Sequence, residues 1–165
     1  GSDVPFFVYN CRFAWVTGRG ERIKPLPGLD KRVFWHVIAV PEINVSTPRI
    51  YKHWDELISD KNCTLSGLTR PASNAKLISL AFRSKDKKSL SHSIFNSLEA
   101  ATMDLYPQVS RVKQSFASLG VKTILMSGSG PAVFGIVASK KEAMTVVRQL
   151  KKRYGVRFAV FARTV

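Results

Sequence analysis

The succession of elements that the sequence predicts from residue 122 onward constrains the fold most strongly. Lys122 to Met126 and Val133 to Ala138 are short apolar runs, and the glycine-rich segment Ser127–Pro131 lies between them. Apolar runs bounded by glycine and proline are typical of strands joined by a tight turn. The sequence therefore predicts two neighbouring strands with a glycine turn between them.

A helix and a last strand are predicted to follow this pair. Ser139 and Glu142 have the spacing of a capping box, and Gly155 is suited to end the helix. The residues expected to face the core are Ala143, Val146, Val147 and Leu150. Val156–Ala162 alternates as a final strand does.

The middle of the chain predicts one buried strand and several helices. Val33–Val40 is a nearly continuous apolar run that ends at Pro41, as expected for a central strand. A helix is predicted from Ser46-Thr47-Pro48 to about Leu57, because a hydroxyl residue and a proline suit a first helical turn. Residues 75–82 are a shorter helical candidate.

Two apolar stripes with helical spacing follow. The first stripe consists of Leu90, Ile94, Leu98, Ala101 and Leu105. After Pro107, the second consists of Val109, Val112, Phe116 and Leu119, and it stops at Gly120. The order of elements is therefore strand, helices, strand, strand, helix, strand. This order predicts an α+β class and a ferredoxin-like split βαβ domain over residues 31–165.

Residues 1–30 are expected to contribute a few strands of a different domain. The runs Phe6–Tyr9, Arg12–Val16 and Arg22–Leu26 are aromatic or β-branched, and Thr17–Gly20 between the last two has turn chemistry. Strands without their usual sheet partners present open edges, so self-association of this chain is expected.

The composition is strongly basic, with 26 Lys plus Arg against 11 Asp plus Glu and a formal charge of +15. Such a surface attracts polyanions, and a basic ferredoxin-like domain is an alternative as a nucleic-acid-binding module. Residues 133–137 hold one aromatic and no basic-glycine pair before it, unlike the RNA-binding motif of such domains, so nucleic acid is not the preferred partner. A noncatalytic interaction domain is a third, less specific class.

No apolar run approaches the ~20 residues that a membrane span requires, and the chain start lacks the features of a signal peptide. A soluble cytoplasmic protein is expected.

Two features could carry chemistry. Glycines in the Ser127–Pro131 turn would let backbone amides approach an anion, although a tight turn needs glycine for conformational reasons alone. Asp3, beside an aromatic segment, could accept a proton or could be an ordinary solvated carboxylate. The histidines have no metal-ligand spacing, and His36 in a predicted buried strand reads as a core residue.

Four segments together resemble one family. They are Gly1-Ser2-Asp3-Val4-Pro5-Phe6-Phe7 followed by Gly18-Arg19-Gly20-Glu21, then Val45-Ser46-Thr47-Pro48-Arg49-Ile50-Tyr51, then Asn96-Ser97-Leu98-Glu99, and last Met126-Ser127-Gly128-Ser129-Gly130-Pro131 with Ala132-Val133-Phe134-Gly135. Their order and spacing resemble those of small-molecule kinases of the GHMP superfamily. Within it they are most similar to the kinases of isoprenoid precursor synthesis that act on a cytidine-diphosphate-linked methylerythritol.

The resemblance implies transfer of the γ-phosphoryl group of ATP, with Mg²⁺, to the 2-hydroxyl of that sugar alcohol. It implies that Asp3 is the catalytic acid that receives or orients the proton of the attacking hydroxyl. Thr47 and Tyr51 match positions of the cytidine pocket, Tyr51 by stacking on the base. The substrate-binding turn would be formed by Gly128, Ser129 and Gly130.

The resemblance also places residues 1–30 at the end of the family's amino-terminal domain and residues 31–165 in its carboxyl-terminal domain. Ser97 stands where these kinases carry an acid. Their phosphate loop, PxxxGLGSSxA, is not found among the 165 residues, so this chain alone is expected to be inactive.

Overall fold

The computed structural model divides the chain into two compact units, one of residues 1–33 with 163–165 and one of residues 34–162. The structure describes residues 3–26, 28–29, 32–59, 74–84 and 87–164.

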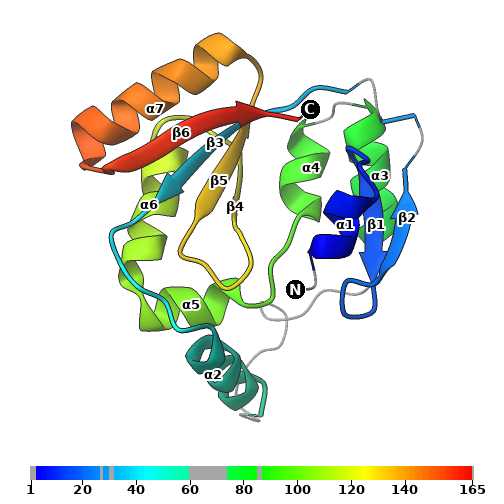
Figure 1. The fold of residues 1–165 in the computed structure, drawn as a ribbon. Coiled ribbons are helices and arrows are strands. Elements are labelled where there is room, and N and C mark those ends of the chain that lie inside the picture. Colours follow the sequence, from blue (N-terminus) through cyan, green and yellow to red (C-terminus); the bar gives the residue numbers. More distant parts are fainter. Residues whose placement is uncertain (1–2, 27, 30–31, 60–73, 85–86, 165) are drawn as a thin grey trace. The chain divides into compact units, whose positions relative to one another are not determined.

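The first unit combines a short helix with a two-stranded ribbon (Figure 1). β1 (Ala14–Thr17) pairs antiparallel with β2 (Arg22–Pro25), which confirms the predicted hairpin. The strand predicted at Phe6–Tyr9 is wrong, because α1 (Val4–Val8) is a helix there. Pro5 lies in its first turn, where a proline fits, and its carbonyl accepts the amide of Tyr9 at 3.1 Å. Self-association stays a prediction, which now rests on the β1–β2 ribbon alone.

The second unit is built on a four-stranded sheet in the order β4-β5-β3-β6. β3 (Trp35–Val40) and β4 (Thr123–Met126) both pair antiparallel with β5 (Val133–Val137), and β6 (Phe158–Arg163) flanks β3. This is the strand order of a split βαβ domain, so the predicted fold class is confirmed. The predicted central strand starts two residues later than expected, at Trp35.

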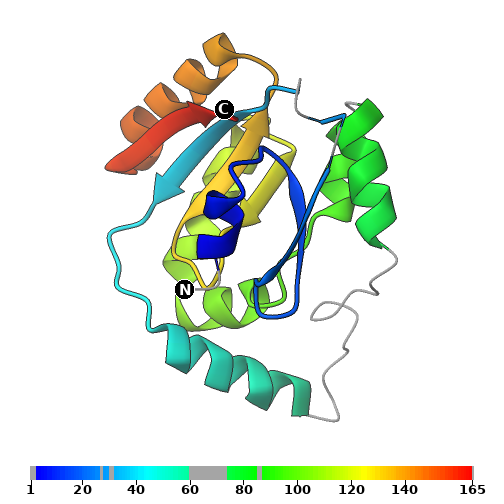
Figure 2. The same cartoon turned by 45° about the vertical axis from the view of Figure 1, so that its right-hand side comes forward.

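Two helices cover one face of this sheet (Figure 2). They are α6 (Pro107–Ser118) and α7 (Lys140–Tyr154), and the predicted capping box of α7 is confirmed by the bond from the Glu142 amide to Ser139 Oγ. The largest fully buried side chain is Phe116 of α6. A Cβ at Gly135 would lie 3.0 Å from Cδ1 of Phe116, so β5 needs glycine where this ring packs.

Alternate residues of the sheet face the other way and form a second cluster. α3 (Asn74–Ser84) and α4 (Lys87–Ser93) supply Ala81 and Leu90, which pack with Ile136 of β5. The rings of Phe34 and Phe82 meet edge to face in this cluster, with centroids 5.1 Å apart.

The single helical stripe predicted from Leu90 to Leu105 is wrong, because the chain leaves the helix after Ser93 and resumes it in α5 (Glu99–Leu105). The side chain of Asn96 accepts the amide of Leu98 at 3.0 Å, and such a local bond competes with the helical one. The apolar spacing continues across the break, which explains the misleading pattern.

The remaining helix, α2 (Thr47–Ser59), packs against α5 beyond the end of the sheet (Figures 1 and 2). It begins where the sequence predicts. Among the described residues, no helix has the length and apolar character needed to cross a membrane.

Candidate functional site

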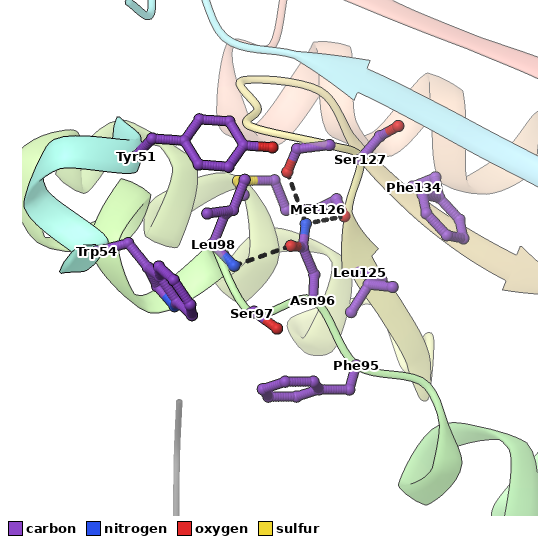
Figure 3. Close-up of a pocket in the computed structure, with 11 residues that line it drawn as sticks. Tyr51, Trp54, Phe95, Asn96, Ser97, Leu98, Leu125, Met126, Ser127 and Phe134 are labelled. Carbon is purple, nitrogen blue, oxygen red and sulfur yellow. Dashed lines mark hydrogen bonds between the residues drawn. The ribbon is translucent and has the colours of Figure 1, made fainter. Parts of the chain in front are cut away.

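A pocket of about 540 Å³ opens at the end of the sheet nearest to α2 (Figure 3). Its volume lies within the usual range for small-molecule sites. Its walls come from α2, from the segment between α4 and α5, and from β4, β5 and the glycine turn. The lining residues are Tyr51, Trp54, Phe95, Asn96, Ser97, Leu98, Leu125, Met126, Ser127, Gly128 and Phe134.

Tyr51 projects its ring from α2 toward the turn at Ser127 (Figure 3). It is 51% exposed, whereas its neighbour Ile50 is fully buried and anchors the helix. α2 therefore uses Ile50 for packing and leaves Tyr51 free to contact a ligand. An aromatic face in this position can stack on a planar ring.

The glycine turn is joined to α2 by a hydrogen bond between two hydroxyl groups. Thr47 Oγ1 and Ser129 Oγ lie 2.8 Å apart, although 82 positions separate the residues in sequence. Gly128 and Gly130 have φ angles of 55° and 84°, values that favour glycine. A Cβ at Gly130 would also lie 2.8 Å from Sδ of Met126. The turn therefore needs glycine at Gly130 for both its backbone angle and its packing.

Glu99 supports the turn from the start of α5. Its Oε1 accepts the amide of Met126 at 2.9 Å and lies 2.7 Å from Nζ of Lys113. The side chain is only 14% exposed, so the carboxylate is largely removed from water and is paired there. The last residue of β4 is thus fixed just before the turn begins.

The structure brings together all the predicted substrate-binding residues. Tyr51 and Gly128 line one pocket, Thr47 binds Ser129, and Gly130 completes the same turn. Asp3 lies in the first unit, where it is exposed, and it precedes α1 without capping it through its side chain. Gly1 and Ser2, the first two residues of the segment Gly1–Phe7 that resembles the family, lie outside the described residues.

Several pocket residues were not singled out for a role by the sequence analysis. Trp54 and Phe95 add two aromatic side chains to the walls, and the buried indole nitrogen of Trp54 has no hydrogen-bond partner among the described residues. Trp54 follows Tyr51 by three positions, which places both on one side of a helix. That spacing was the sequence signal that could have identified Trp54 as a neighbour of Tyr51 in the pocket. Asn96 belongs to the segment Asn96-Ser97-Leu98-Glu99 that resembles the family, but nothing in the sequence showed what its side chain binds.

His36 lies on β3, where its ring meets that of Phe134 edge to face at 6.3 Å. Burial lowers the pKa of His36 from its ordinary value of 6.5, because the charged form loses its hydration. This matches the sequence interpretation of His36 as a packed residue. In the part of the chain that the structure describes, no group of three or more His, Cys, Asp or Glu side chains is placed to hold a metal ion.

Comparison with known proteins shows what this chain is similar to. Residues 78–156 match the family model described as GHMP kinases C terminal. The chain is 36% identical to 4-diphosphocytidyl-2-C-methyl-D-erythritol kinase of Levilactobacillus brevis over 91% of its own length and 48% of that protein. It is 34% identical to the kinase of the same name from Moorella thermoacetica, over 93% of this chain and 50% of that protein. The chain therefore spans about half the length of these relatives.

Solved structures agree with the sequence matches. A crystal structure of 4-(cytidine 5'-diphospho)-2C-methyl-D-erythritol kinase superposes with a TM-score of 0.72 at 26% identity, covering 99% of this chain and 53% of that one. Homoserine kinase from Cytophaga hutchinsonii superposes with a TM-score of 0.67 over 92% of this chain and 47% of that one, at 19% identity, and shares the fold. Residues 78–156 therefore match the carboxyl-terminal domain of GHMP kinases, and nearly the whole chain is similar in sequence and fold to part of the 4-diphosphocytidyl-2-C-methyl-D-erythritol kinases.

Proposed function

We propose that this chain is part of a kinase that transfers the γ-phosphoryl group of ATP to the 2-hydroxyl of 4-diphosphocytidyl-2-C-methyl-D-erythritol, in isoprenoid precursor synthesis. The observation that carries the proposal is the bond between Thr47 and Ser129. It joins two of the segments that resemble the family at the edge of one pocket. We expect the protein to act in the cytoplasm.

In this proposal the pocket holds the cytidyl end of the substrate. The exposed ring of Tyr51 stacks on the base, and Thr47 keeps α2 in register with the turn. The turn of Gly128, Ser129 and Gly130 contacts the diphosphate-linked part of the substrate. Phosphoryl transfer depends on positioning and on charge stabilisation more than on covalent chemistry, so a rigid turn suits it.

Asp3 is proposed as the group that receives or orients the proton of the attacking hydroxyl. An exposed carboxylate at the start of a helix has the chemistry for this role. Mg²⁺ would enter with ATP, and its usual contribution is to neutralise charge on the phosphates. The described residues offer no cluster that fits the ion, so none of them is assigned as its ligand.

A chimera tests the proposal directly. The chain from Asp3 onward is joined to the amino-terminal part of the Levilactobacillus brevis relative, since the chain aligns with 48% of that protein. We expect the chimera to convert ATP and the cytidyl substrate to ADP and a phosphorylated product, and the chain alone to be inactive. A folded chimera that phosphorylates homoserine instead would contradict the proposed substrate.

A further inference from the structure

The carbonyl groups of residues 126–129 in and before the glycine turn each accept a hydrogen bond. Asn96 Nδ2 donates to the carbonyls of Met126 at 2.9 Å and Gly128 at 2.8 Å. The carbonyl of Ser129 accepts Oγ1 of Thr102 at 3.3 Å. Within the turn, the amide of Gly130 donates to the carbonyl of Ser127 at 2.9 Å. The direction of each peptide group in the turn is thereby fixed.

Because the peptide group is planar, these hydrogen bonds to carbonyl groups also fix the direction of the amides that follow them. In a trans peptide the N–H points opposite to the C=O of the preceding residue. Because Asn96 holds the carbonyl of Gly128, the amide of Ser129 points away from Asn96. The amides of Gly128 and Ser129 have no hydrogen-bond partner among the described residues. Two free amides in a glycine turn form the kind of concave donor site that binds anions.

The orientation of the Asn96 side chain is itself determined. Its Oδ1 accepts the amide of Leu98 at 3.0 Å, so its nitrogen must face the two carbonyls (Figure 3). The reversed amide would place an oxygen against both carbonyls. Asn96 also lies in the break between α4 and α5.

We propose that Asn96 is the positioning residue of the glycine turn: by holding the carbonyls of Met126 and Gly128, it fixes the turn in the form in which the amide of Ser129 is free for a phosphate oxygen of the substrate. The neighbouring amide of Gly128 is oriented by the bond between the Ser127 carbonyl and the Gly130 amide within the same turn, and it is free as well. This inference rests on the proposed function for the identity of that anion. Asn96 acts through the turn and does not itself touch the anion.

Replacing Asn96 with aspartate provides the sharpest test. The carboxylate keeps the acceptor for Leu98 but sets an oxygen against the two carbonyls, so the turn must rearrange. In the chimera, Asn96→Asp should lower kcat about 100-fold, the usual effect of misplacing a reacting group, while KM for ATP changes little. Gln114→Glu is the matched control, because it makes the same amide-to-carboxylate change on exposed Gln114 of α6. It should leave kcat unchanged.

A second measurement does not depend on activity. In an NMR titration of this chain with inorganic pyrophosphate, the amide resonances of Gly128 and Ser129 should shift, and Asn96→Asp should abolish the shifts. If Asn96→Asp does not fold by circular dichroism, Asn96→Ala takes its place, because it removes the donors without adding charge.

The outcomes separate the two proposals. Wild-type kcat in folded Asn96→Asp, or pyrophosphate shifts that persist in the variant, would overturn the role of Asn96. So would pyrophosphate shifts in the wild type that spare Gly128 and Ser129. If the wild-type chimera is inactive but the shifts occur and depend on Asn96, the positioning role stands and the proposed kinase reaction fails.

Discussion

Glu99 and Lys113 form an ion pair of 2.7 Å between α5 and α6, and the same carboxylate oxygen accepts the amide of Met126. Helix–helix packing and the end of β4 are therefore tied to one group. A change in this ion pair should therefore alter the position of Met126, just before the glycine turn.

Glu99→Gln should lower the free energy of unfolding by about 1 to 3 kcal/mol, because a largely buried charge-assisted interaction is lost. Urea denaturation measures this. Glu42→Gln is the control, since Glu42 pairs with Arg157 at 3.2 Å on the surface and such pairs contribute about 0 to 1 kcal/mol. Equal losses in the two variants would show that Glu99 has no special structural role.

Gly135→Ala should destabilise the second unit by about 1 to 3 kcal/mol through overpacking. The new methyl group would lie 2.8 Å from Cγ1 of Val121 and 3.0 Å from Cδ1 of Phe116. Adding Phe116→Leu should recover part of the loss, because the smaller side chain makes room and the two changes are coupled. Strictly additive free energies in denaturant titrations would contradict this packing argument.

His36 should make stability depend on pH. Burial lowers its pKa below 6.5 in the folded protein, so between the two values the unfolded chain binds a proton that the folded chain does not. Stability from this residue is complete above about pH 6.5 and decreases as the pH falls from there toward the folded pKa. His36→Gln should lose less stability than the wild type between about pH 7.5 and about pH 5. Equal losses of stability in the wild type and in His36→Gln on acidification would contradict this role of His36.

Asp3→Asn in the chimera should lower kcat by roughly 10²- to 10⁴-fold with little change in the affinity for either substrate, because the amide keeps the shape but cannot take a proton. Asp55→Asn is a suitable control, since Asp55 is exposed on α2 and does not line the pocket. Single-turnover kinetics separate the chemical step from binding. Wild-type turnover in Asp3→Asn would remove Asp3 from the reaction.

Most of the fold of the second unit could be predicted, because its elements carry local signals. The cap at Ser139 and the end of α7 at Gly155 depend on neighbours within a few positions. The errors arose where a distant or subtle interaction decides. At Asn96 the helical stripe is interrupted where its side chain binds the Leu98 amide, and its other bonds reach residues 30 and 32 positions away, which no periodicity reveals. At Phe6–Tyr9, aromatic residues suggested a strand, and Pro5 in a first helical turn was overlooked.

The candidate site was predictable only in part for the same reason. Resemblance to the family named Thr47, Tyr51 and the glycine turn, and the structure brings these together. The contribution of Asn96 could not be found in the same way, because it consists of two bonds to main-chain carbonyls, which carry no sequence signature. Residue type gives the capacity for such bonds, and only the fold supplies the partner.

Tyr51→Ala tests the central claim most directly, namely that the pocket beside the glycine turn binds the cytidyl substrate. Stacking on an aromatic ring contributes roughly 1 to 3 kcal/mol, so the change should weaken binding of that substrate to the chimera by about five- to 150-fold. ATP binding should change little. Tyr154→Ala is the matched control, because Tyr154 is 40% exposed at the end of α7 and does not line the pocket.

Calorimetric titration of each substrate into the folded chimera and its two variants gives the answer. The account predicts that Tyr51→Ala weakens binding of the cytidyl substrate alone and that Tyr154→Ala binds both substrates as the wild type does. Unchanged affinity of folded Tyr51→Ala for the cytidyl substrate would contradict it.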